Sequence, residues 1–108
     1  MLSKKERLKR VDFSRFFSLG RRIHHRYFTL VYAPHSTPHI SVVVSKKVAS
    51  KAVARNNMRR RVYDSVRNYI RGEECSGVFI FLMKKEAFEA SSENLREAVV
   101  SIMQKVEG

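Results

Sequence analysis

The most informative stretch of this chain is residues 51–63, which read Lys51-Ala52-Val53-Ala54-Arg55-Asn56-Asn57-Met58-Arg59-Arg60-Arg61-Val62-Tyr63. At about 100° per residue, a helix through this stretch gathers an apolar stripe on one side, made of Met58, Val62, Ser65, Val66 and Tyr69. The neighbouring arc, called the cationic face below, carries Asn56, Arg59, Arg60, Tyr63 and Arg67, with Arg55 at its border. The spacing predicts one helix from about Ser50 to Arg71, packed by its apolar stripe.

The cationic face indicates a polyanionic partner. Asp64 is the only carboxylate between Lys51 and Arg71, so few ion pairs can form along the helix. Arginine suits phosphate because its planar guanidinium donates two parallel hydrogen bonds and also stacks on bases. A charged helix face is often only solvated, but the imbalance of sign favours binding of nucleic acid.

The charge of the whole chain has the same bias. Lys and Arg number 22 against 10 Asp and Glu, and the excess lies in residues 1–72, with 18 basic and 3 acidic side chains. Residues 73–108 hold 4 basic and 7 acidic side chains. A potential this positive attracts anions and is typical of proteins that bind nucleic acids or anionic membranes, and atypical of metabolic enzymes.

Length and composition predict a single domain over residues 1–108. The apolar fraction of 44% supports a packed core rather than disorder. No apolar run approaches the roughly 20 residues of a membrane span, and Met1-Leu2-Ser3-Lys4-Lys5 has no apolar signal region. The single cysteine, Cys75, fits a reducing compartment. We therefore expect a cytoplasmic protein.

The remaining elements are short. Asp12 is a good N-cap for a helix that carries Phe13, Phe16 and Phe17 and ends at Gly20. Strands are predicted at Tyr27–Ala33, Ile40–Ser45 and Val78–Met83, the first two as an antiparallel hairpin and the last apolar enough to be central. Ser91 or Ser92 is the expected N-cap of a closing helix. The prediction is an α+β fold, a two-layer sandwich of helices on a small sheet.

Alternation divides the strand Tyr27–Ala33 into two faces. The set Phe28, Leu30 and Tyr32 is large enough to face the main core. On this reasoning the opposite face carries Tyr27, Thr29 and Val31.

Groups for catalysis or metal binding are scarce. His24 and His25 are adjacent and would point apart, and His35 and His39 flank prolines, so neither pair has zinc-ligand spacing. Glu73 and Glu74 would raise the pKa of Cys75, which argues against a reactive thiolate. Four glycines leave no glycine-rich phosphate loop. We expect no metal site in the protein and no catalysis by the protein alone.

The chain resembles the bacterial ribonuclease P protein subunit over nearly its whole length. Asp12-Phe13-x-x-Phe16-Phe17-x-x-Gly20 is similar to that family's first helix. Ser45-Lys46-Lys47-Val48, followed by Lys51 to Asn56 and by Arg59-Arg60, resembles its signature strand, connector and basic helix. Two positions depart from the motif: Asn57 stands where a second arginine is usual, and Tyr63 where a basic residue is frequent.

The resemblance implies a fold of order αβββαβα with three helices, about four strands in a mixed sheet and a left-handed βαβ crossover. It also implies a division of labour within a ribonucleoprotein. The RNA subunit hydrolyses the phosphodiester bond with Mg²⁺ that it holds itself, and so removes the 5′ leader of precursor tRNA. The protein binds the ribonuclease P RNA and the precursor, with no obligatory protein partner.

Two residue sets follow from the resemblance. The RNA-binding set is Lys46, Lys47, Lys51, Arg55, Asn56, Arg59, Arg60, Tyr63 and Arg67. The set expected in the cleft for the single-stranded leader is Phe13, Phe17, Tyr27, Thr29 and Val31, because aromatic and apolar groups stack unpaired bases without regard to sequence. From periodicity alone, core packing of Phe13 and Phe17 is at least as good an interpretation.

Other interpretations stay open at this point. A small basic ribosomal protein, or another protein that binds structured RNA, would share this size, charge and compartment. A helix-turn-helix regulator would need two consecutive short helices, whereas strands flank the basic helix here. A peripheral membrane protein would expose aromatic residues opposite the basic face, but that side is predicted to be core.

Overall fold

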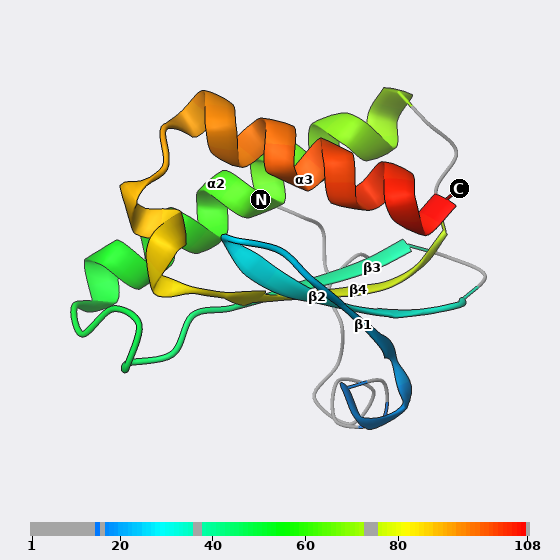
Figure 1. The fold of residues 1–108 in the computed structure, drawn as a ribbon, viewed down its shortest axis with the longest axis horizontal. Helices are drawn as coiled ribbons and strands as arrows, with labels where there is room; N and C mark the ends of the chain where they lie inside the picture. The colour runs from blue at the N-terminus through cyan, green and yellow to red at the C-terminus, as the bar shows by residue number, and fades with distance from the viewer. Residues whose placement is uncertain (1–14, 16, 36–37, 73–75, 108) are drawn as a thin grey trace.

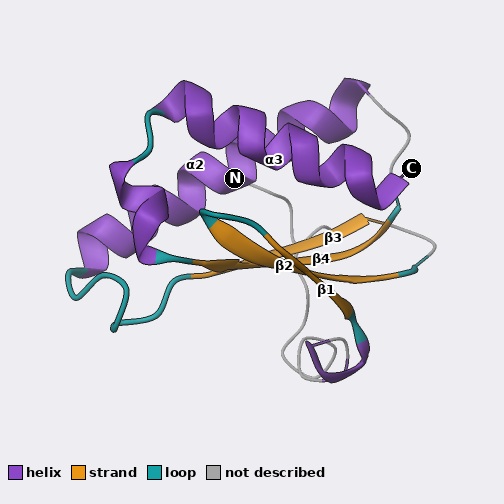
Figure 2. Cartoon of the chain, in the orientation of Figure 1, coloured by secondary structure: helices purple, strands orange, loops and turns teal. Residues whose placement is uncertain are grey.

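The computed structural model describes residue 15 and residues 17–35, 38–72 and 76–107. Helix α2 (Ala52–Gly72) and helix α3 (Ser92–Glu107) cover one face of a four-stranded sheet (Figure 1). Residues 15 and 17–19 are helical and lie beyond the other face, below the sheet in Figure 2. The predicted α+β sandwich is therefore confirmed. Asp12, Phe13 and Phe16 of the expected first helix lie outside the described residues.

The sheet is mixed and has the order β1-β2-β4-β3. Strand β2 (Phe28–Ala33) pairs antiparallel with both β1 (Arg21–His24) and β4 (Gly77–Met83). Strand β3 (Pro38–Val43) lies at the edge and pairs parallel with β4. The unit β3-α2-β4 is thus a parallel βαβ unit, and the long helix that connects its strands is α2.

The predicted hairpin between Tyr27–Ala33 and Ile40–Ser45 is wrong, because β4 lies between β2 and β3. The physical reason is the composition of β4, in which every residue except Leu82 is buried. A strand that is buried on both faces gains most in the middle of a sheet, between two partners. Strand β1 was not predicted from its residues, because three of its four residues are basic. Of the four, only Ile23 is half-buried, which is typical of an edge strand.

The main core lies between the sheet and the two helices. Alternate residues of β2 and β4, including Phe28, Leu30, Phe79 and Phe81, point toward the helices and are fully buried. Helix α2 contributes Met58, Val62 and Val66 from its predicted apolar stripe, and these are also fully buried. Helix α3 adds Leu95, Val99, Ile102 and Met103.

A second, smaller cluster lies on the opposite face of the sheet, called the Phe17 face below. Its buried members are Val31, Ala33, Val78 and Ile80, and partly buried Phe17, Val43 and Leu82 pack against them. The sheet is therefore apolar on both faces. Within the described residues, no helix is both long enough and apolar enough to span a membrane.

Candidate RNA-binding surfaces

The cationic face of α2 is solvent-accessible and surrounds a hollow of about 260 Å³, called the α2 cavity below. Asn56, Arg59, Arg60 and Tyr63 line it. Asn56 and Arg60 are exposed, and Arg59 and Tyr63 are half-buried. The Arg59 guanidinium donates a hydrogen bond to Asn56 Oδ1, one helical turn away. The α2 cavity thus joins two guanidinium groups, an amide and a phenol, which are groups that bind phosphates and bases.

Among the described residues, those that line the α2 cavity include no acidic side chain. Asp64, the carboxylate of this helix, lines a separate hollow that also involves Ser92 and Arg96 of α3. It therefore faces the second helix rather than the α2 cavity. Asp64 follows Arg60 by one turn of α2, but the residues that line the α2 cavity include two arginines and no carboxylate, so the potential of the cavity attracts phosphate.

Tyr63 also has a structural contact that the sequence did not reveal. Its hydroxyl oxygen accepts a hydrogen bond from the backbone N–H of Val42 in the edge strand β3, at 3.3 Å. This bond ties the middle of α2 to the sheet edge. Hydrophobic periodicity gives no signal for such a contact, because it depends on the position of β3 beside the helix.

The connector between β3 and α2 contributes further cations. Lys46, Lys47 and Lys51 are exposed. The turn is held by Ser45, whose carbonyl oxygen accepts the N–H groups of Val48 and Ala49, both at 3.1 Å. These lysines continue the charge of the cationic face past the N-terminus of α2.

Arg55 is half-buried and fixes this connector from the helix side. Its Nη1 donates to the carbonyl oxygens of Ala49 at 2.9 Å and Ser50 at 2.7 Å. Part of its hydrogen-bonding capacity is therefore used within the protein. Arg67, also half-buried, lies one turn beyond Tyr63 on the same arc of α2.

The residues expected in the leader cleft are only partly brought together. Phe17 packs against the cluster that contains Val31, and Arg22 lies over its ring at 4.7 Å. Val31 is 1% exposed and Thr29 is 8% exposed, so these two do not form the open floor that was expected. Thr29 instead shares a hydrogen bond with His24 Nδ1 at 3.2 Å. Phe13 lies outside the described residues.

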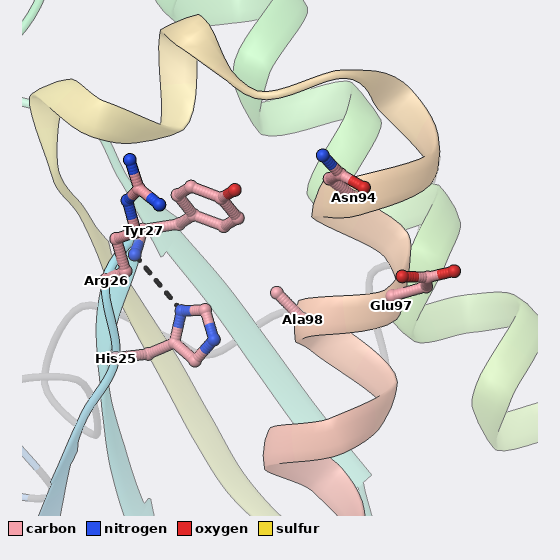
Figure 3. Close-up of a pocket in the computed structure, with 6 residues that line it drawn as sticks. All are labelled: His25, Arg26, Tyr27, Asn94, Glu97 and Ala98. Atoms are coloured by element: carbon pink, nitrogen blue, oxygen red, sulfur yellow. Dashed lines mark hydrogen bonds between the residues drawn. The ribbon is translucent and has the colours of Figure 1, made fainter.

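The placement of Tyr27 beside Thr29 and Val31 is wrong. Strand β2 begins at Phe28, and Tyr27 lies in a bend where strand alternation does not apply. Its side chain packs against the main core and faces α3, as Figure 3 shows. Tyr27 is therefore on the helix-covered side of the sheet, opposite to the Phe17 face.

Comparisons with known proteins agree on one family. The family model described as Ribonuclease P matches residues 2–107. The relatives named Ribonuclease P protein component from Microcystis aeruginosa and Coxiella burnetii are each 31% identical to this chain over 99 residues. These matches cover 84% and 89% of this chain and 82% and 80% of the relatives. The RNase P protein of Thermotoga maritima has the same fold, with a TM-score of 0.84 at 24% identity over 95% of this chain and 99% of that one. The chain belongs to the ribonuclease P family.

Proposed function

We propose that this chain is the protein component of a ribonuclease P holoenzyme and assists removal of the 5′ leader from precursor tRNA. The observation that carries the proposal is the α2 cavity, whose lining residues Arg59, Arg60, Asn56 and Tyr63 include two cations and no carboxylate. Membership of the family supports association with ribonuclease P RNA. In this proposal the holoenzyme acts in the cytoplasm, the compartment expected from the sequence.

The role of the protein in this proposal is electrostatic and positional. Two RNAs repel one another through their phosphates, and guanidinium and ammonium groups between them remove part of that repulsion. The cationic face and the exposed connector lysines supply such groups. Binding there lowers the concentration of Mg²⁺ that the RNAs need to come together.

The chemical step is assigned to the RNA subunit, with Mg²⁺ as the cofactor that the RNA holds. In the described part of the chain, no group of three or more His, Cys, Asp or Glu side chains is placed to hold a metal ion. The protein residues in the proposal bind and orient RNA, and none of them takes part in breaking the phosphodiester bond.

Binding of the single-stranded leader is assigned to the Phe17 face. Phe17 is half-buried, so one side of its ring packs on the sheet while part of it stays accessible. Arg22 beside the ring adds a positive charge that suits a phosphate of the leader. This face lies across the sheet from α2 and α3, and the precursor would therefore meet a surface different from the α2 cavity.

The test compares two double variants of equal charge. Arg59→Ala with Arg60→Ala removes the guanidinium groups of the α2 cavity, and Lys85→Ala with Arg96→Ala removes two exposed cations elsewhere. The measurement is the Mg²⁺ concentration at half-maximal cleavage of precursor tRNA by a ribonuclease P RNA with each protein. We expect the wild type and the Lys85/Arg96 variant to lower this Mg²⁺ concentration by the same amount, relative to the RNA without protein.

The Arg59/Arg60 variant should need clearly more Mg²⁺ while keeping its unfolding free energy within about 0.5 kcal/mol per substitution, since both side chains reach solvent. Equal Mg²⁺ requirements for the two double variants would contradict the role of the cationic face. A wild-type protein that leaves the Mg²⁺ requirement unchanged would contradict the proposed function itself.

A further inference from the structure

A third hollow, called the α3 pocket below, lies where the bend between β1 and β2 meets the first turns of α3. Its volume is about 370 Å³, and its lining residues are His25, Arg26, Tyr27, Asn94, Glu97 and Ala98. Figure 3 shows the rings of His25 and Tyr27 projecting toward α3, with the methyl group of Ala98 across from them. The α3 pocket shares no lining residue with the α2 cavity, and none of its lining residues belongs to the Phe17 face.

His25 is held in one orientation in this pocket. Its ring stacks on Phe28 with the centroids 4.9 Å apart and the planes 17° from parallel. Its Nδ1 accepts the N–H of Tyr27 at 3.1 Å, and its carbonyl oxygen accepts a hydrogen bond from Lys84 Nζ at 2.8 Å. These three contacts fix both the ring and the bend that carries it.

The same contacts determine which form of the imidazole is present. Burial, followed by the positive charges of Lys105 and Lys84, lowers the pKa of His25 and favours the neutral ring. A neutral imidazole that accepts at Nδ1 carries its proton on Nε2. His25 therefore offers a hydrogen-bond donor at a fixed position, without a charge of its own.

Tyr27 gives the pocket an aromatic wall. It packs against the main core and is half-buried, so part of its ring is left for a ligand. Exposed Arg26 lies with its guanidinium carbon 5.8 Å from the centre of that ring. Across the pocket, Ala98 is buried and small, and the exposed amide of Asn94 can both donate and accept hydrogen bonds.

Charge around the pocket favours an anionic ligand. Three cations lie at or near the pocket, namely Arg26, Lys84 and Lys105. The one acidic residue of its lining is Glu97, whose carboxylate points away from the rings of His25 and Tyr27 in Figure 3. An inorganic anion could accept a hydrogen bond from the Asn94 amide, but it has no flat face to stack on the Tyr27 ring. A nucleotide uses all of these groups, because it joins a flat base with a polar edge to a phosphate.

We propose that the α3 pocket binds one unpaired nucleotide of an RNA, with the base on Tyr27, its polar edge toward His25 Nε2 and Asn94, and the phosphate toward Arg26. The choice of RNA as the source of the nucleotide rests on the proposed function. The pocket gives the protein a third RNA contact, separate from the α2 cavity and from the Phe17 face. An acidic peptide is the competing ligand, since it would use the cations but not the aromatic wall.

The first test follows the backbone amide resonances of the full chain during titration with adenosine monophosphate. Ribose 5-phosphate is the control for the phosphate alone, and a tetraglutamate peptide is the control for negative charge. We expect saturable shifts at Tyr27, Asn94 and Ala98 with adenosine monophosphate and much smaller shifts with either control. No shift at these residues, or equal shifts with ribose 5-phosphate or the peptide, would overturn the proposal.

The second test uses matched variants. Tyr27→Leu keeps apolar contact with the core but removes the aromatic ring, and it should weaken binding of adenosine monophosphate about tenfold, the order expected for one stacked base. Asn94→Ala should also weaken binding, whereas Asn68→Ala, an exposed asparagine of α2 outside this pocket, should not. If Tyr27→Leu fails to fold, the comparison of Asn94→Ala with Asn68→Ala tests the proposal instead. Equal affinities for Asn94→Ala and Asn68→Ala would then overturn the proposal.

The outcomes also separate this inference from the proposed function. Arg59→Ala with Arg60→Ala should leave the adenosine monophosphate shifts at Tyr27 and Ala98 unchanged, since neither arginine lines the α3 pocket. A protein that binds the nucleotide there but never lowers the Mg²⁺ requirement of cleavage would overturn the proposed function alone. A protein that lowers the requirement but shows no shift at the pocket would overturn this inference alone.

Discussion

At the scale of single residues, Tyr63 combines a structural contact with a place in the α2 cavity. Its ring lines the cavity beside Arg59, and its hydroxyl group accepts the N–H of Val42. Strand β3 has β4 on one side only, so backbone groups on its other side need partners from elsewhere. A tyrosine at this position can satisfy one of them, which a lysine or arginine could not, because neither has an acceptor atom.

Replacement of Tyr63 by phenylalanine should lower the free energy of unfolding by about 0.5–1.5 kcal/mol, the usual net contribution of one hydrogen bond. Urea denaturation of the isolated protein measures the change. Tyr27→Phe is the matched control: no hydrogen bond of the Tyr27 hydroxyl is found among the described residues, and we expect a change within about 0.5 kcal/mol. Equal effects of the two substitutions would show that the Val42 bond contributes nothing to stability.

At the scale of elements, the start of α3 is defined by one side chain. Ser91 Oγ accepts the N–H of Asn94 at 3.1 Å, and the Ser91 carbonyl oxygen accepts the N–H of Leu95 at 3.0 Å. Ser91 is therefore the N-cap, the first of the two serines that the sequence offered. This start determines where Asn94 and Ala98 stand relative to the bend at Tyr27.

Substitution of Ser91 by alanine should destabilise the protein by about 1 kcal/mol, within the usual range of roughly 0.5–2 kcal/mol for a lost N-cap. Ser92→Ala provides the control, because Ser92 is exposed and the Asn94 N–H is already bonded to Ser91. Its effect should stay within about 0.5 kcal/mol. Thermal unfolding monitored by circular dichroism compares the two, and a larger loss for Ser92→Ala would contradict the assignment of the cap.

At the scale of the whole molecule, the positive charge is distributed over several surfaces. The cationic face lies on α2, and the exposed connector lysines precede it in the chain. Arg22 lies beside Phe17 on the other side of the sheet, and Arg26 lies at the α3 pocket. The formal net charge of +12 is therefore available to RNA from more than one direction. A small domain with this charge distribution can lie between two RNA segments.

Affinity for ribonuclease P RNA should fall steeply with salt, by about 0.7–0.9 in log affinity per unit of log salt for each phosphate that is neutralised. Filter binding over a series of monovalent salt concentrations at constant Mg²⁺ gives the slope. The Arg59→Ala and Arg60→Ala double variant should reduce the slope by about 1.4–1.8, or about 0.7–0.9 for each lost phosphate contact. A wild-type affinity that hardly changes with salt would contradict electrostatic binding.

Much of this structure was predictable from local patterns. The limits of α2, the burial of Met58, Val62 and Val66, and the central place of β4 follow from periodicity and composition, because they depend on how each segment meets water. The solvent-accessible cationic face, with Asn56 and Arg60 exposed, was predictable for the same reason. Here the spacing of residues along one helix is enough to place them on one face.

Strand order and the α3 pocket were decided only by the tertiary structure. The sequence places β3 after β2, but the buried surface of β4 separates them, and no local signal reports which strands will be neighbours. Alternation placed Tyr27 beside Val31, whereas a bend one residue before β2 turns its ring toward α3. The contacts of Tyr63 with Val42 and of Tyr27 with α3 join residues far apart in the chain. The sequence by itself determined the cationic face of α2 and the apolar stripe beside it. Long-range packing decided which other residues share a surface, because such contacts form only when whole elements come together.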